Sequence, residues 1–179
     1  MLRVGQTAPS FSLPGTAGDD IDDHTLADYV DNGWHVILVF YPFDFHPACV
    51  SQLCTIRDAG WLTLLDQTVV LGVGADSVHA HRRFAREYNV DFPLLSDTDG
   101  RVAEAYGVLE AEFEGHRDVP GMALFVVDPD RRIQFAWRGD DADTEPDFDA
   151  VEKAARCRDD ECDVPDDESE ATGTDVAGG

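Results

Sequence analysis

The segment from Phe40 to Cys54 carries the residues with the clearest chemical potential, because it places a cysteine where a helix is expected to begin. An apolar stretch from Val36 to Phe40 comes first, and Pro42 ends that stretch in a turn. Unpaired N–H groups and the positive dipole end at a helix start stabilise a thiolate over a thiol. Cys49 is therefore predicted to be a nucleophile.

Three further cysteines leave several pairings open. Cys54 follows Cys49 by five residues, close enough in sequence to act as a resolving thiol. Cys157 and Cys162 repeat this spacing, which allows a four-thiolate zinc site, although the spacing fits only the upper edge of what structural zinc pairs use. A tail thiol that resolves Cys49 is a second alternative, and the simplest reading has Cys157 cap the last helix. Without a secretion signal, four cysteines indicate redox or metal chemistry rather than a disulfide framework.

The nucleophile needs a scaffold, and hydrophobic patterning predicts one of alternating strands and helices. Extended segments are expected at 5–13, 34–41, 68–75, 92–95, 122–127 and 133–137, and helices at 25–30, 47–66, 77–88, 101–106 and 146–156. The Gly- and Asp-rich residues 14–23 are expected to form a turn or loop. Pro47 suits the first turn of the helix that carries Cys49, and Ser77 is the expected N-cap of the helix after it.

This order of elements predicts an α/β sandwich around a mixed sheet, with helices on both sides. The cysteine then lies at a strand-to-helix junction on the carboxyl edge of the sheet, where ligand sites usually fall. Residues 1–158 are expected to form one domain, and residues 159–179 an acidic disordered tail. No apolar stretch approaches 18 residues, so we expect a cytoplasmic protein.

The chain is strongly acidic, with 37 Asp and Glu residues against 13 Lys and Arg residues and a net charge of −24. Residues 159–179 hold nine acidic residues and no basic one, so residues 1–158 still have 28 acidic and 13 basic residues. Asp, a poor helix former, outnumbers Glu by 27 to 10, and Lys153 is the single lysine. Such a composition is typical of proteins that work in molar salt, where the Debye length is roughly 3 Å. An ordinary acidic mesophilic protein is the alternative to a protein that works in molar salt. In either case the negative charge disfavours nucleic acid and anionic membranes as partners.

Four motifs resemble those of the peroxiredoxins, and within that family those of the bacterioferritin-comigratory, atypical two-cysteine type. The opening GQTAPSFSL, from residue 5, is similar to the family's G-x-x-A-P-x-F-x-L, and FYP from residue 40 precedes Cys49 at the family's spacing. Residues 49–58, CVSQLCTIRD, resemble the subgroup's C-x-x-Q-x-C-x-x-R-D, and FVVD at 125–128 resembles a family strand. The resemblance extends over about residues 3–157.

The resemblance implies a thioredoxin-like fold with an N-terminal extension and the activity of a thiol-dependent peroxidase. Cys49 is the implied peroxidatic cysteine, attacking hydrogen peroxide or an organic hydroperoxide to become a sulfenic acid. Cys54 is the implied resolving cysteine, forming an intramolecular disulfide that a thioredoxin- or glutaredoxin-like protein reduces, and Pro42 is the motif proline. No cofactor or metal is implied, and the chain is expected to be a monomer or a homodimer.

The sequence departs from the family pattern at two positions. His46 stands where the family has Thr or Ser, whose hydroxyl binds the peroxide. It could donate an N–H to peroxide oxygen and, when protonated, favour the Cys49 thiolate; the alternatives are a neutral imidazole base and a solvent-facing loop residue. Met122 stands where the family has an arginine, and Arg117, five residues upstream, could replace that arginine only through a rearranged loop.

Three function classes therefore remain open. A thiol peroxidase, with activity impaired by His46 and Met122, is the favoured one. The alternative is a degenerate peroxiredoxin that acts as a thiol redox sensor or interaction module with little turnover, and a thiolate metal-binding protein is the third. Cys54 itself could instead be a buried apolar residue of its helix.

Overall fold

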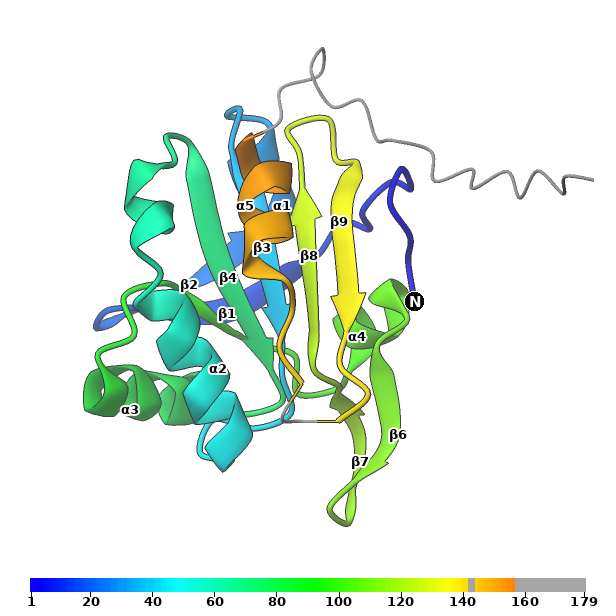
Figure 1. Cartoon of the computed structure of the whole chain (residues 1–179). Helices are drawn as coiled ribbons and strands as arrows, with labels where there is room; N and C mark the ends of the chain where they lie inside the picture. The colour runs from blue at the N-terminus through cyan, green and yellow to red at the C-terminus, as the bar shows by residue number, and fades with distance from the viewer. Residues whose placement is uncertain (142–143, 157–179) are drawn as a thin grey trace, which may run out of the picture.

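A seven-stranded mixed sheet forms the centre of the molecule in the computed structural model, which describes residues 1–141 and 144–156 (Figure 1). Its strand order is β2-β1-β5-β4-β3-β8-β9, and β6 and β7 form a separate two-stranded hairpin. The strands are β1 (Ser12–Ala17), β2 (Asp20–Thr25), β3 (His35–Phe40), β4 (Thr68–Gly74), β5 (Leu94–Ser96), β6 (Leu109–Phe113), β7 (His116–Pro120), β8 (Ala123–Val127) and β9 (Ile133–Arg138). The helices are α1 (Leu26–Val30), α2 (Pro47–Arg57), α3 (Val78–Tyr88), α4 (Arg101–Tyr106) and α5 (Phe148–Arg156), with a 3-10 helix at Gly60–Leu64.

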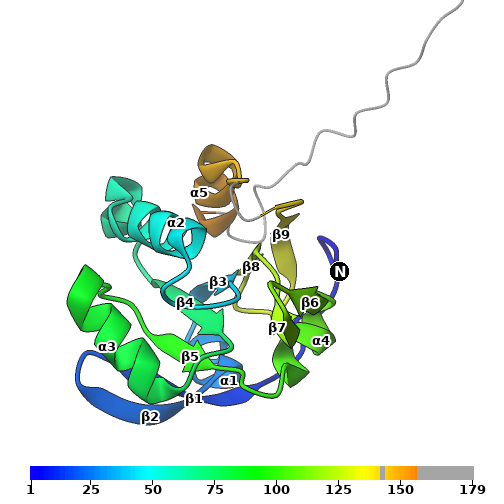
Figure 2. The same ribbon diagram turned by 90° about the horizontal axis from the view of Figure 1, so that it is seen from below.

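The central strand β3 is buried along its whole length because helices cover both faces of the sheet (Figure 2). Its side chains alternate between the faces, as the pleat of a strand requires. Val36, Leu38 and Phe40 pack in one core with residues of α1 and α4. Ile37 and Val39 pack in the other core with residues of α2, α3 and α5. This arrangement confirms the predicted α/β sandwich around a mixed sheet.

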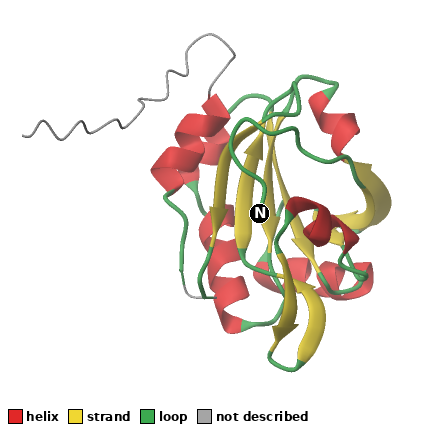
Figure 3. Cartoon of the chain, turned by 90° about the vertical axis from the view of Figure 1, so that its right-hand side faces the viewer, coloured by secondary structure: helices red, strands yellow, loops and turns green. Residues whose placement is uncertain are grey.

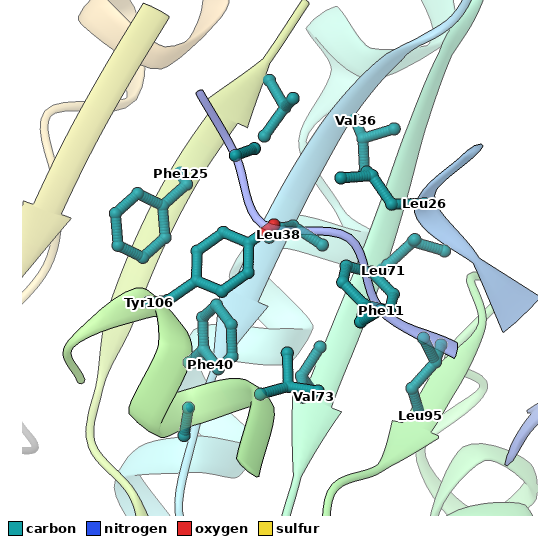
Figure 4. Close-up of a cluster of buried hydrophobic side chains, with 14 of the residues drawn as sticks. Phe11, Leu26, Val36, Leu38, Phe40, Leu71, Val73, Leu95, Tyr106 and Phe125 are labelled. Carbon is teal, nitrogen blue, oxygen red and sulfur yellow. The ribbon is translucent and has the colours of Figure 1, made fainter. Parts of the chain in front are cut away.

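An aromatic cluster fills the first core (Figure 4). The ring of Tyr106 lies 5.3 Å from that of Phe40 and 5.4 Å from that of Phe125, measured between centroids. The Tyr106 hydroxyl donates a hydrogen bond of 2.9 Å to the carbonyl of Pro9. Through this bond the N-terminal segment is fixed to the core, and the buried hydroxyl has the partner that it needs.

The pairing of β3 with β8 determines what lies next to the predicted nucleophile. The two strands are antiparallel, and Phe40 at the end of β3 pairs with Ala123 at the start of β8. Met122 therefore reaches the sheet beside the turn that follows β3, although 73 residues separate it from Cys49 along the chain.

The predicted loop at 14–23 is wrong, because β1 and β2 form a hairpin there with a turn at Gly18, whose φ is +64°. Gly18 allows this left-handed backbone without strain. The acidic residues of β2 are tolerated because β2 is an edge strand, with one side facing solvent. Pro14 fits within β1 because β5 pairs only with Gly15 and Thr16.

Two other boundaries differ from the prediction. The helix that carries Cys49 ends at Arg57 rather than near residue 66, and Gly60, a poor helix former, begins a separate 3-10 helix. The hairpin of β6 and β7 is not predicted, although Glu114 and Gly115 at its tip both have positive φ, as a tight hairpin turn requires. Figure 3 shows this hairpin projecting from the body of the molecule.

The remaining helices and the β8–β9 hairpin agree with the prediction within a few residues. Ser77 is the N-cap of α3, as expected, and its hydroxyl accepts a hydrogen bond from the N–H of Ala80. Cys157, Cys162 and the predicted acidic tail lie outside the described residues. No helix in the described part of the chain is long and apolar enough to cross a membrane.

Candidate active site

Cys49 lies in the first turn of α2, directly after the carboxyl end of β3. Pro47 is at the start of the helix and His46 is its N-cap. The Cys49 side chain is fully buried, and the backbone N–H groups of Phe43 and of Cys49 itself point at the sulfur. The segment thus forms the predicted cysteine at a helix start, with hydrogen-bond donors directed at the sulfur atom.

Burial outweighs these donors in setting the charge state of the thiol. Burial is the largest single influence on the pKa of Cys49, since a thiolate loses its hydration in an apolar site. The carboxylates of Asp44 and Asp76 act in the same direction and the two N–H groups in the opposite one, so that the pKa is raised from 9.0 to about 11 in total. Cys49 is therefore a thiol at neutral pH in this conformation, contrary to the expectation from the helix start alone.

Met122 lies against the sulfur, in the position where the family pattern has an arginine. Its Sδ is 3.8 Å from Cys49 Sγ, and its side chain is buried. A thioether is a weak hydrogen-bond acceptor and carries no charge, so it gives a thiolate no stabilisation. Arg117, the residue considered as a replacement for that arginine, is exposed on β7 and lies opposite Glu112 of β6 in the hairpin.

His46 connects the start of α2 to the β6–β7 hairpin. Its Nδ1 accepts a hydrogen bond of 3.3 Å from the N–H of Ala48, and its Nε2 lies 3.4 Å from a carboxylate oxygen of Glu114. An accepting Nδ1 places the proton on Nε2, which donates toward Glu114. The side chain is 18% exposed, so the interpretation as a solvent-facing residue is wrong. Both ring nitrogens are engaged by groups other than Cys49.

The tip of the hairpin covers the loop before Cys49 with aromatic rings. The ring of Phe113 lies 5.2 Å from that of His46, and the ring of His116 lies 4.6 Å from that of Phe43, measured between centroids. Figure 1 shows the hairpin at the same end of the sheet as the start of α2. Sequence reasoning missed this cover, because it comes from an element that the prediction left out.

Cys54 is on the same helix as Cys49, and both are free thiols. Cys54 is half-buried. Five residues of continuous α-helix separate Cα atoms by roughly 8–9 Å, beyond the limit of about 7 Å for a disulfide. A bond between these two cysteines therefore requires the start of α2 to unwind.

A buried polar network anchors the loop between β3 and α2, and the sequence prediction did not include it. His81 of α3 and Asp44 of the loop are both fully buried, and His81 Nδ1 lies 2.8 Å from either oxygen of the Asp44 carboxylate. Tyr41 donates a hydrogen bond of 2.8 Å to the same carboxylate, and His81 Nε2 lies 3.1 Å from the carbonyl of Leu95. Asp44 is 37 residues from His81, so no local pattern predicts this contact.

Gln52 is a buried polar residue of α2 near Cys49. Its side chain is 3% exposed, and neither its amide nitrogen nor its amide oxygen has a hydrogen-bond partner among the described residues. Residues three apart on a helix are neighbours, and helical side chains lean toward the N-terminus. The Gln52 amide is thus placed over the turn that holds Cys49.

The described residues contain no group of three or more His, Cys, Asp or Glu side chains arranged to hold a metal ion. The zinc site considered from Cys157 and Cys162 lies outside the part of the chain that the structure describes.

Known proteins share both the sequence and the fold around this site. The model of the AhpC/TSA family matches residues 4–136. The chain belongs to this family. Peroxiredoxin Bcp of Escherichia coli strain K12 is 34% identical over 152 residues, which cover 84% of this chain and 93% of the relative. Peroxiredoxin Bcp of Bacillus subtilis strain 168 is 31% identical over 139 residues, which cover 76% of this chain and 85% of the relative.

A solved structure confirms the fold of this peroxiredoxin. Peroxidoxin BcpB from Mycobacterium tuberculosis aligns with a TM-score of 0.71 and 27% identity, covering 87% of this chain and 95% of that one. The predicted thioredoxin-like fold is therefore correct, and so is the resemblance to the Bcp-like type. Within this family fold, the chain has a histidine cap at position 46 and a thioether at position 122 beside the cysteine sulfur.

Proposed function

We propose that this peroxiredoxin is a thiol peroxidase in which Cys49 is the peroxidatic cysteine and Cys54 the resolving cysteine. The observation that carries the proposal is the Cys49 sulfur in the first turn of α2, with the N–H groups of Phe43 and Cys49 directed at it. The membership of the AhpC/TSA family favours a peroxidase over a redox sensor or an interaction module.

In the first step, the Cys49 thiolate attacks one oxygen of the peroxide. A sulfur–oxygen bond forms, the oxygen–oxygen bond breaks, and the leaving oxygen takes up a proton to become water or an alcohol. The peroxide is reduced and the sulfur is oxidised to a sulfenic acid. The N–H groups of Phe43 and Cys49 stabilise the thiolate, and the motif proline, Pro42, is buried in the turn that leads to them.

In the second step, the thiol of Cys54 attacks the sulfenic sulfur, a disulfide forms and water leaves. The first turns of α2 unwind to bring the two sulfurs together. A thioredoxin- or glutaredoxin-like dithiol protein then reduces the disulfide by thiol–disulfide exchange, which restores both thiols and the helix.

We further propose that the first step is slower in this protein than in family members that have the motif hydroxyl and arginine. His46 and Met122 replace a hydroxyl and a guanidinium, and loss of one oxyanion-binding donor costs about 2.7–4 kcal/mol in other enzymes. His46 compensates in part as a positioning residue, since its Nδ1 caps the N–H of Ala48 next to Cys49.

Stopped-flow measurement of the reaction of the reduced protein with hydrogen peroxide tests this function. We expect oxidation of Cys49, a Cys49–Cys54 disulfide detected by mass spectrometry, and a sulfenic acid that persists in Cys54→Ser.

Met122→Arg should raise the second-order rate constant for the reaction with hydrogen peroxide at least tenfold, because it adds a donor beside the sulfur. Absence of Cys49 oxidation at millimolar peroxide contradicts the proposal, and an unchanged rate in His46→Ala contradicts the role of His46.

A further inference from the structure

A pocket of about 250 Å³ lies beside Met122, the residue whose side chain contacts the buried Cys49 sulfur. Pro42, Phe113 and Met122 supply its apolar surface. Met122 lies between the pocket and the cysteine: it lines the pocket, and its Sδ is 3.8 Å from Cys49 Sγ. Since Cys49 itself is fully buried, a molecule in the pocket is separated from the sulfur by one side chain. Methionine is flexible and adapts its packing readily, so it can move aside.

Four carboxylates border the same pocket. Glu110 and Glu112 come from β6, and Asp140 and Asp141 from the segment after β9. The residues that line the pocket in the described chain include no basic one. Arg138, outside the lining, forms an ion pair with Glu110. An anion that enters the pocket therefore meets like charge.

Two glycines of the pocket lining lie close to residues of the carboxylate border. A Cβ atom at Gly121 would lie 2.6 Å from a carboxylate oxygen of Glu110, and one at Gly139 would lie 2.8 Å from the carbonyl of Asp141. At position 139 the close atom belongs to the backbone, so a side chain there would require the backbone to shift, whereas at position 121 it is the end of the flexible Glu110 side chain, which can move away.

We propose that this pocket is the peroxide-binding site and that it selects uncharged hydroperoxides over those that carry a carboxylate. The apolar part of the substrate packs on Phe113 and Pro42, Met122 moves aside, and the carboxylate border excludes anions. The inference rests on the proposed peroxidase function and adds its substrate class.

The reactive test compares two substrates, a short hydroperoxide with a carboxylate and its methyl ester, which differ in charge and by one methyl group. We expect the ester to oxidise Cys49 at least tenfold faster at low ionic strength. The ratio of the ester rate to the carboxylate rate should decrease in Glu112→Gln and in Asp140→Asn. It should also decrease in molar salt, which screens the charges of the carboxylate border. Glu104→Gln, on the exposed side of α4, is the control and should leave the ratio unchanged. Equal rates for the two substrates in the wild type overturn the selectivity.

A binding test separates failure of the pocket from failure of the peroxidase function. The chain has two methionines, so ¹³C-methyl labelling gives two signals, one from Met122 and an internal control from Met1. The alcohols that correspond to the two hydroperoxides serve as unreactive probes. We expect the ester alcohol to shift the Met122 signal and the carboxylate alcohol to leave it unchanged. No shift with either alcohol overturns the pocket assignment, whereas a selective shift without any oxidation of Cys49 supports the pocket and contradicts the function.

Discussion

At the scale of single residues, the Cys49 sulfur is subject to two opposing influences. The helix start and the N–H groups of Phe43 and Cys49 favour a thiolate, while burial and the Asp44 carboxylate favour a thiol. The second influence is the stronger one, because the loss of hydration on burial is the largest contribution; Met122, which contacts the sulfur, adds no charge to oppose it. The reactivity of Cys49 therefore depends on movements that expose it or bring a donor to it.

The raised pKa of Cys49 predicts how its alkylation depends on pH. With a pKa of about 11, the thiolate is roughly one part in 10⁴ at pH 7 and increases tenfold with each pH unit. Alkylation of Cys49 by iodoacetamide should accelerate in the same proportion from pH 7 to pH 10. Mass spectrometry of the Cys49 peptide measures this rate separately from the other thiols. A rate that levels off below pH 8 would show that the folded protein stabilises the thiolate.

The unpartnered amide of Gln52 predicts a gain in stability on its removal. An unsatisfied polar group in a protein interior costs about 1–3 kcal/mol, so Gln52→Met should raise the free energy of unfolding by about 1 kcal/mol or more. Urea denaturation of the reduced protein measures the change. Gln134→Met is the matched control and should destabilise, because Gln134 donates a hydrogen bond to Asp128. A loss of stability in Gln52→Met is the result that contradicts the argument.

At the scale of elements, three parts of the chain hold the Cys49 loop from different directions. β8 brings Met122 to the sulfur, the β6–β7 hairpin covers His46 and Phe43, and α3 binds Asp44 through His81. The start of α2 is thus enclosed by elements far from it in sequence. Any unwinding of α2 must also loosen the contact between His46 and Glu114 of the hairpin.

The contact between Asp44 of the loop after β3 and His81 of α3 predicts a large loss of stability when one of the two side chains is removed. Both side chains are fully buried, and removal of one partner of a buried pair costs about 3–5 kcal/mol because the other charge is left without compensation. His81→Leu should lower the free energy of unfolding by this amount in urea denaturation. Arg83→Leu on the same helix, where the side chain is 76% exposed, should change it by less than about 1 kcal/mol. Similar values for both variants would contradict the importance of the buried pair.

At the scale of the whole molecule, the net charge of −24 is the dominant property. Exposed carboxylates concentrate on elements such as β2, where Asp20 and Asp22 lie two residues apart on an edge strand. Side chains two apart in a strand share a face, so these like charges repel one another. Such repulsion destabilises the compact state unless salt screens it.

This charge predicts that the protein is stabilised by salt. Raising KCl from about 0.1 M to about 2 M shortens the Debye length from roughly 10 Å to below 3 Å, and the Tm should rise by several degrees. Thermal unfolding followed by circular dichroism measures it. The triple variant Asp20→Asn, Asp22→Asn, Asp23→Asn should be more stable than the wild type at low salt and should respond less to KCl. A Tm that falls or stays constant with salt would contradict the prediction.

The sequence by itself determined the parts of this protein that depend on local patterns. Apolar runs such as 34–41 and 122–127 predicted buried strands, and Ser77 predicted a helix cap. The spacing of Pro42 and Cys49, combined with the opening segment and the Cys49–Cys54 motif, predicted the family. The β1–β2 hairpin and the end of α2 were missed. Polar residues on an edge strand and a glycine after a helix become interpretable only once their neighbours are known.

Only the tertiary structure decided the environment of the reactive sulfur. Burial of Cys49, its contact with Met122, and the network from Asp44 to His81 all join residues that lie far apart in sequence. The pKa of a thiol depends on solvent and charges within a few ångströms, and strand register and helix packing set those distances. Hence the sequence indicated which cysteine could react, while packing determined that it is a thiol at neutral pH, with a carboxylate-bordered pocket beside it.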